Sequence, residues 1–145
     1  MDFEKRFTYK ILPELALIVE YWNGDYSFEE ILELKNIEAS DPEWRDSFNV
    51  LADDRQTNFR IEALIKDNGK YFSVSQKFVK KRKTALLTSL PKQVATSVLM
   101  QMHQHPEALV TVEIFSTVNA SLQWLQINRN EWNRIDTLLD QLKKE

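Results

Sequence analysis

Two adjacent carboxylates, Asp53 and Asp54, end a short apolar run at residues 48–52. Such a run predicts a buried strand, and open α/β sheets bind ligands outside the carboxyl ends of their strands. Thr88 and Ser89 close a second run of this kind, at residues 84–89. Oxygen ligands from such side chains are the ones that Mg²⁺ prefers. The pattern therefore offers a magnesium site, with metal-dependent hydrolysis as its chemistry.

The same pair of aspartates has a structural interpretation. In this interpretation Asp53 caps a helix, and Asp54 is solvated or pairs with Arg55. An acidic pair alone is a motif of low specificity. We therefore favour the structural interpretation and expect neither a catalytic residue nor a metal ligand.

Other residue types that carry chemistry are sparse. His103 and His105 point apart on a helix, and two ligands without a third do not form a closed metal site, so we interpret both as exposed loop residues. The two glycines, Gly24 and Gly69, are too far apart to build a P-loop or a dinucleotide-binding fingerprint. No cofactor is expected.

Composition excludes further classes. The net charge is −3, so the basic surplus of a nucleic-acid-binding protein is missing. The basic run at residues 80–83 could bind phosphate, anionic lipid or an acidic partner, but we interpret it as a solvated junction between a helix and a strand. The absence of cysteine removes disulfides and thiolate chemistry. No run approaches the roughly 18 apolar residues of a membrane span, and we expect a cytoplasmic protein.

The elements that position these residues follow from hydrophobic patterning. Residues 7–11 alternate apolar and polar side chains, whereas residues 15–21 are almost wholly apolar, and Pro13 separates the two segments. This pattern predicts a hairpin whose second strand is buried on both faces. Apolar runs at residues 48–53, 84–88 and 109–115 predict three further strands, each followed by a helical pattern.

Capping signals locate several helices. Ser27 with Glu30 forms a capping-box pattern that predicts a helix over residues 28–39. Thr57 or Asn58 is predicted to cap another helix, and further helices are expected at about residues 71–79 and 91–102. Ser116 and Thr117 are predicted to cap a short helix at residues 118–127. A second capping-box pattern at residues 128–131 precedes a final helix with one apolar face.

The order of elements implies the fold class. A hairpin followed by three strand–helix units predicts an α/β fold, with a mostly parallel mixed sheet of about five strands, an N-terminal antiparallel hairpin and flanking helices. A chain of 145 residues is most simply one domain, residues 1–145.

This order resembles that of the anti-sigma factor antagonist (STAS) domains, and in particular the SpoIIAA-like, or STAS/SEC14-like, branch of small bacterial proteins. The resemblance covers residues 7–127 and depends on the segments 41–44, 48–53, 84–87 and 112–117, with Ala120 and the pair Trp124 and Leu125. It implies a single SpoIIAA-like domain that acts as a protein-binding or signalling module. Phosphorylated members carry an Asp-Ser pattern after the central strand. Here residues 53–57 lack it, so we carry over no phosphorylation site.

We therefore expect a non-enzymatic binding module of STAS-like form that acts through a protein partner or by self-association. The predicted binding surface consists of Asp53, Asp54, Arg55, Thr57, Thr88 and Ser89. The alternative is a carrier of a small apolar molecule or lipid, with an apolar cavity between the sheet and the helices. A magnesium-dependent hydrolase using Asp53 and Asp54 is the third hypothesis.

Overall fold

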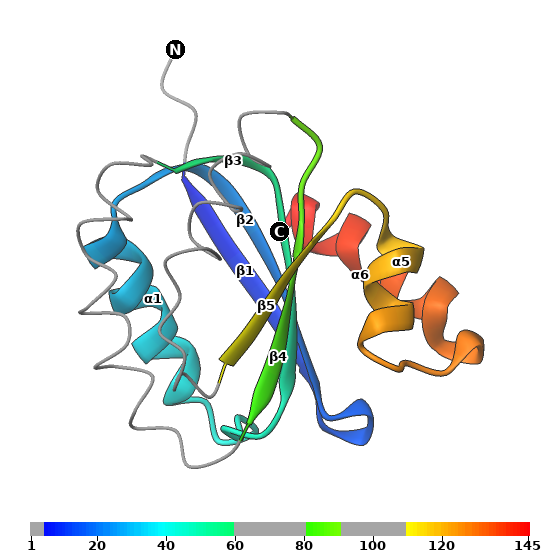
Figure 1. Ribbon diagram of the computed structural model, residues 1–145. Helices are drawn as coiled ribbons and strands as arrows, with labels where there is room; N and C mark the ends of the chain where they lie inside the picture. The colour runs from blue at the N-terminus through cyan, green and yellow to red at the C-terminus, as the bar shows by residue number, and fades with distance from the viewer. Residues whose placement is uncertain (1–4, 60–80, 91–109) are drawn as a thin grey trace.

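The computed structural model describes residues 5–59, 81–90 and 110–145. These residues form one five-stranded sheet in the order β1-β2-β3-β4-β5, with helices on both faces (Figure 1). The strands are β1 (Arg6–Leu12), β2 (Leu17–Tyr26), β3 (Asn49–Phe59), β4 (Arg82–Leu87) and β5 (Val110–Phe115). The α-helices are α1 (Phe28–Ala39), α5 (Val118–Trp124) and α6 (Trp132–Lys144). Two short 3₁₀ turns are η1 (Pro13–Leu15) and η2 (Arg129–Glu131).

The strand pairing confirms the predicted mixed sheet. Strands β1 and β2 are antiparallel and are joined by η1, whereas β2, β3, β4 and β5 are all parallel to one another. Thr84 of β4 pairs with Val50 on one side and with Val112 on the other. The three apolar runs after the hairpin therefore belong to one sheet, as their spacing predicted.

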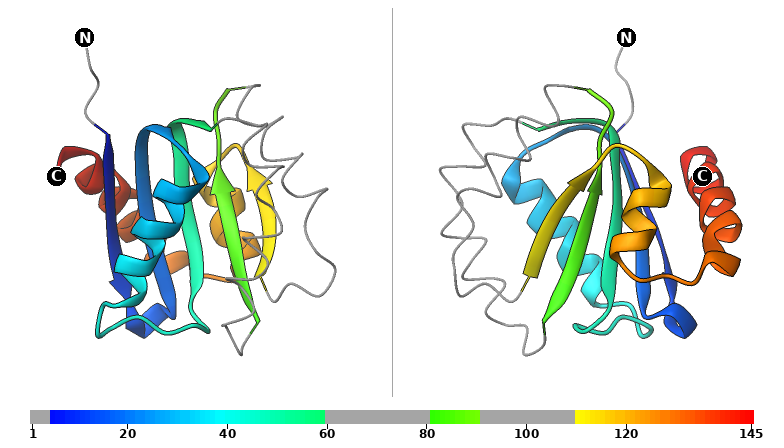
Figure 2. Two further views of the ribbon diagram at one scale, coloured as in Figure 1. Left: turned by 90° about the vertical axis from the view of Figure 1, so that its left-hand side faces the viewer. Right: turned by 45° about the vertical axis from the view of Figure 1, so that its right-hand side comes forward.

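Helix α1 covers one face of the sheet (Figure 2). Its predicted capping box is confirmed: the Glu30 N–H donates to Ser27 Oγ at 3.2 Å, and the Ser27 N–H donates to Glu30 Oε1 at 3.0 Å. Ile31 and Leu34 pack against a buried apolar cluster. The sheet's members of this cluster include Ile11, Ile18, Trp22, Val50 and Ala52.

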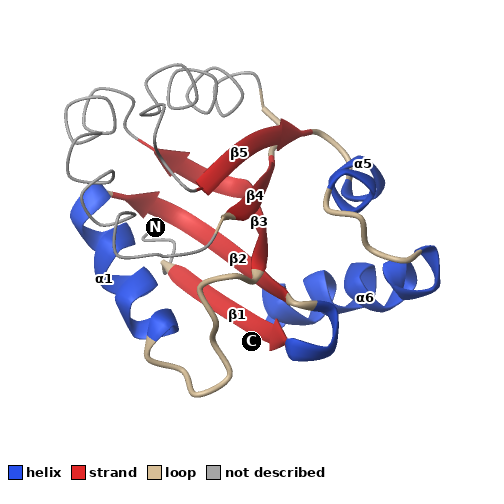
Figure 3. Ribbon diagram, turned by 60° about the horizontal axis from the view of Figure 1, so that its bottom comes forward, coloured by secondary structure: helices blue, strands red, loops and turns tan. Residues whose placement is uncertain are grey.

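Helices α5 and α6 cover the opposite face (Figure 3). Because strand side chains alternate between faces, Leu51 points to these helices while its neighbours Val50 and Ala52 point to α1. Of the two predicted capping residues, Ser116 and Thr117, it is Thr117 that caps α5, and its side chain accepts from the Ala120 N–H at 3.2 Å. The helices contribute Leu122, Leu125, Ile135, Leu139 and Leu142 to the buried core on this side.

The second predicted capping box, at residues 128–131, is wrong. The Asn128 side chain accepts from the Asn130 N–H at 2.9 Å, one residue earlier than a capping box requires. The Glu131 carboxylate instead accepts from Arg134 at 3.3 Å. The segment consequently forms η2, and α6 begins at Trp132.

The predicted end of the central strand is also wrong. Strand β3 continues to Phe59, so Thr57 lies inside a strand and caps no helix. After a register shift between Tyr21 and Asn23, the last residues of β2 pair with β3 up to the pair of Tyr26 and Phe59. The helices predicted after this strand, at residues 71–79 and at 91–102, lie outside the described residues, as do His103, His105 and Gly69. Within the described ranges, no helix is long and apolar enough to cross a membrane.

Candidate functional site

Asp53 is fully buried and forms a two-bond ion pair with Arg55. The Arg55 guanidinium donates from Nε to Asp53 Oδ1 at 2.9 Å and from Nη2 to Oδ2 at 2.8 Å. The Arg55 backbone N–H also donates to Oδ1 at 3.2 Å. The expectation that Asp53 caps a helix is therefore wrong. Asp53 is instead the acceptor that orients Arg55.

Arg55 lies on the face that α6 covers. Its hydrogen bonds with Asp53 raise the pKa of the guanidinium, and the negative charges of Asp136 and Asp140 on α6 act in the same direction. The Arg55 side chain is 27% exposed. The structure therefore places a partly exposed cation, with a fixed orientation, near the carboxyl end of β3.

Asp54 points to the other face and is only 4% exposed. Its Oδ1 atom makes no hydrogen bond, and burial raises the pKa of its carboxyl group well above the ordinary value, with the charges of Glu20 and Asp53 adding to the shift. The expectation that Asp54 is solvated or pairs with Arg55 is wrong. The reason is that neighbouring residues of a strand point to opposite faces of the sheet.

This alternation also bears on the magnesium hypothesis. Asp53 points toward α6, and Asp54 points toward α1, so the two carboxylates do not converge on one point. In the described part of the chain, no group of three or more acidic or histidine side chains is arranged to hold a metal ion.

The three hydroxyl residues of the predicted surface have different surroundings. Thr57 is buried and donates to the Asp54 carbonyl at 2.7 Å. Thr88 is buried at the end of β4, where its N–H donates to the Phe115 carbonyl at 2.9 Å. Ser89 is exposed, and its hydroxyl donates to the Arg55 carbonyl at 3.5 Å. Of the six predicted residues, the structure thus brings Arg55 and Ser89 together at the surface, and it buries the others.

Leu90 adds an apolar group to this surface. Its side chain is 55% exposed and directly follows Ser89. We call Arg55, Ser89 and Leu90 the carboxyl-end surface. Leu90 was not among the predicted surface residues, because exposure of an apolar residue after a strand has no local signal.

A buried charge cluster under α1 was missed entirely. Lys35 of α1 donates to Glu20 of β2 and, at 2.8 Å, to Glu38 of α1. The Trp22 indole N–H donates to Glu20 at 3.0 Å. Glu20 and Glu38 are 2% and 0% exposed, and Glu38 Oε2 has no hydrogen-bond partner. The available signal was a single glutamate, Glu20, inside an otherwise apolar strand.

The two glutamates of this cluster differ in protonation. Burial alone would raise the pKa of Glu20, but the charge of Lys35 and several hydrogen bonds lower it to about 2. Burial and the neighbouring negative charge of Glu20 raise the pKa of Glu38 to about 9. At neutral pH the cluster therefore holds an ionised Glu20, a charged Lys35 and a protonated Glu38.

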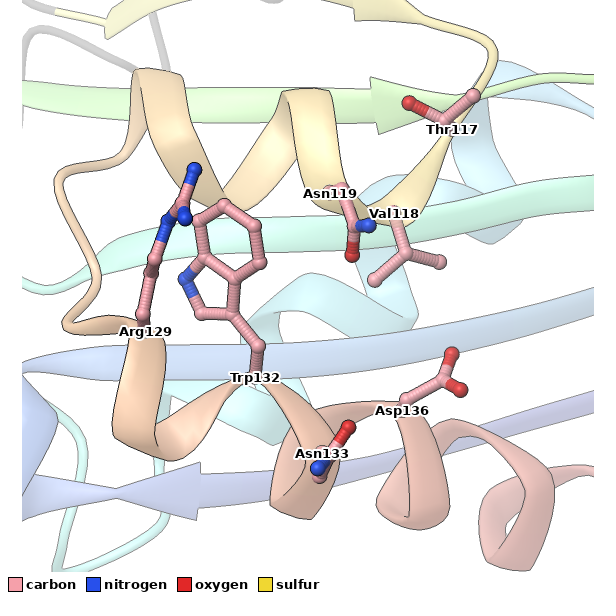
Figure 4. A pocket seen from close by; sticks show the side chains of 7 residues that line it. All are labelled: Thr117, Val118, Asn119, Arg129, Trp132, Asn133 and Asp136. Carbon is pink, nitrogen blue, oxygen red and sulfur yellow. The ribbon is translucent and has the colours of Figure 1, made fainter.

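A cavity of about 570 Å³ lies between the start of α5 and the start of α6. Polar side chains line it, among them Asn119, Arg129, Asn133 and Asp136, around the indole ring of Trp132 (Figure 4). It lies in the helix layer, and it differs from the apolar cavity between sheet and helices that a lipid carrier would need.

Comparison with known proteins supports the fold. No protein-family profile matches the sequence, and no curated protein is similar to it in sequence. Among solved structures, the chain is similar to an uncharacterized protein of the DUF3478 family with a SpoIIAA-like fold from Shewanella loihica PV-4. The match has a TM-score of 0.55 at 12% identity and covers 86% of this chain and 98% of that chain. The chain has a SpoIIAA-like fold.

The SpoIIAA-like fold confirms the predicted α/β class and the predicted resemblance at the level of architecture. At 12% identity the likeness concerns the fold alone. Function therefore has to be argued from the side chains of this chain, and above all from those that its SpoIIAA-like sheet presents at the carboxyl end of the parallel strands.

Proposed function

We propose that this protein is a non-enzymatic, protein-binding or signalling module of the STAS-like type, working in the bacterial cytoplasm. The observation that carries the proposal is the composition of the carboxyl-end surface. There, the acids Asp53 and Asp54 are turned inward, while Arg55, the Ser89 hydroxyl and the apolar side chain of Leu90 face outward.

This composition suits a docking surface for a protein. Arginine is enriched among the residues that contribute most to protein–protein binding, and apolar side chains supply the buried centre of an interface. Arg55 is already held by Asp53 through two hydrogen bonds of 2.9 and 2.8 Å. Binding would therefore restrict its side chain little further, which lowers the entropic cost of association.

A charge placed on Leu90 tests the proposal. Leu90→Asp should remove the apolar anchor and abolish capture of the partner that the wild-type protein retains in quantitative affinity proteomics. Ile37→Asp is the matched control, because Ile37 is the other exposed large apolar residue of the described chain, at 58%, and lies on α1. The same proteins should remain bound to this control. Size-exclusion chromatography with light scattering, run on the same variants, tests self-association.

Equal capture and an equal oligomeric state for the wild type and Leu90→Asp would overturn the proposal. The carrier hypothesis predicts a different result, namely a lipid or apolar molecule that copurifies and is visible in native mass spectrometry. Among the described residues, apolar side chains pack together on both faces of the sheet, and we expect protein without such a ligand.

A further inference from the structure

We propose that the cavity between α5 and α6 is a binding site for a neutral, polyhydroxylated ligand the size of a monosaccharide. The cavity volume, about 570 Å³, falls within the range of roughly 300–1,000 Å³ that small-molecule sites occupy. Its lining residues are distinct from the carboxyl-end surface, so the proposal does not depend on the proposed protein-binding function.

The indole ring of Trp132 is one of the side chains that line the cavity. Figure 4 looks onto the flat face of the ring, with the other lining side chains arranged around it. The indole N–H donates to the Ile127 carbonyl at 2.9 Å, which fixes the ring and leaves no donor on it for a ligand. Trp132 can therefore contact a ligand only through the carbon atoms of its ring that Arg129 and the core leave accessible, and such atoms match the C–H groups of a sugar.

The two charges at the cavity are opposite in sign. The Arg129 guanidinium lies over the Trp132 ring, 5.3 Å from its centre, and Asp136 lies on α6 (Figure 4). An anion would be attracted by Arg129 and repelled by Asp136, and the reverse holds for a cation. A neutral ligand with many hydroxyl groups avoids this conflict, because it can accept from the guanidinium and donate to the carboxylate.

The remaining polar groups both donate and accept. Asn119 and Asn133 each offer an amide N–H₂ and an amide oxygen, and within the described residues neither side chain is engaged in a hydrogen bond. The Thr117 hydroxyl accepts from the Ala120 N–H at 3.2 Å, which leaves its own hydrogen free to donate. Mixed donors and acceptors around an aromatic face fit hydroxyl groups, each of which also does both.

Nuclear magnetic resonance tests the site directly. D-glucose, D-galactose, D-mannose and N-acetyl-D-glucosamine are titrated into the ¹⁵N-labelled full chain. At least one sugar should shift the Trp132 indole N–H resonance and the Asn119 and Asn133 side-chain resonances saturably. Asn133→Ala, which removes one exposed amide, should lower the affinity for this sugar by about fivefold, the effect of one lost hydrogen bond. Asn130→Ala, an exposed residue outside the cavity, should leave the affinity unchanged.

Three results would overturn the proposal. The first is that none of the sugars causes a saturable shift in the wild-type protein, while the dispersion of its spectrum shows that it is folded. The second is binding of glycine, glutamate or inorganic phosphate in place of the sugars, which would assign the cavity to an ionic ligand. The third is an equal loss of affinity in Asn133→Ala and Asn130→Ala, which would place the ligand elsewhere.

Discussion

Asp53 and Asp54 are consecutive residues whose carboxyl groups lie on opposite faces of the sheet. Asp53 holds Arg55 on the face covered by α6, whereas Asp54 is buried toward α1 with one oxygen unpartnered. The two acids of this sequence motif therefore have different partners in the structure, on opposite faces of the sheet. This separation argues against a shared metal site and leaves Arg55, not the aspartates, as the charged group that a partner can reach.

Arg55→Ala should lower the free energy of unfolding by about 2–3 kcal/mol, because the buried Asp53 carboxylate loses its counter-ion. Urea denaturation at pH 7 measures this loss. Arg134→Ala is the control, since Arg134 pairs with Glu14 and Glu131 at an exposed position, and its loss should be clearly smaller than that of Arg55→Ala. A loss for Arg55→Ala no larger than that for the control would show that the Asp53 pair does not stabilise the fold.

Glu38 makes the stability depend on pH. The pKa of Glu38 is raised from 4.5 to about 9, so between these values the folded state binds a proton that the unfolded state has lost. The free energy of unfolding should consequently fall as pH rises from about 5 toward about 9. Glu38→Gln, which keeps the neutral shape, should flatten this slope in urea titrations at a series of pH values. Glu33→Gln, an exposed position on the same helix, should retain the slope, and a parallel flattening in both variants would contradict this assignment.

Lys35 is the counter-ion of the buried cluster. Lys35→Met should lower the free energy of unfolding at pH 7 by more than about 2 kcal/mol, because Glu20 stays buried without a cation. In the wild type the pKa of Glu20 is lowered to about 2, so the stability that Glu20 contributes is present above about 4.5 and is lost as pH falls toward 2. Because burial alone would raise the pKa of Glu20, the variant should not show this loss of stability on acidification. Adding Glu20→Gln to Lys35→Met should restore part of the stability, and a further loss instead would mean that Glu20 has another stabilising partner.

Local signals were sufficient to predict much of the fold. Ser27 and Glu30 sit three residues apart and cap α1 in the predicted way, and the change from alternating to continuous apolar residues marked the hairpin. The parallel pairing was also predicted, because each apolar run is followed by a segment long enough to cross over to a parallel neighbour.

The site depends on distant partners, and this is why it was predicted only in part. Residues 54–58 are mostly polar and resemble the start of a helix, yet they extend β3 because residues 23–25 of β2 pair with residues 56–58. Glu20 is tolerated in the core only because Lys35, fifteen residues away, reaches it from α1. Neither contact has a signature in the residues next to it.

The contrast between the two aspartates gives the last prediction. Asp54→Val should raise the free energy of unfolding by about 1 kcal/mol at pH 8, because it replaces a buried carboxyl that has an unpartnered oxygen with a side chain suited to a strand. Asp53→Val should lower it by about 3 kcal/mol, because it removes the carboxylate that accepts two hydrogen bonds from the Arg55 guanidinium. Urea denaturation of the two variants measures both changes. Opposite signs at adjacent positions are the expected outcome, whereas a loss of several kcal/mol from Asp54→Val would show that its carboxyl group has a stabilising partner.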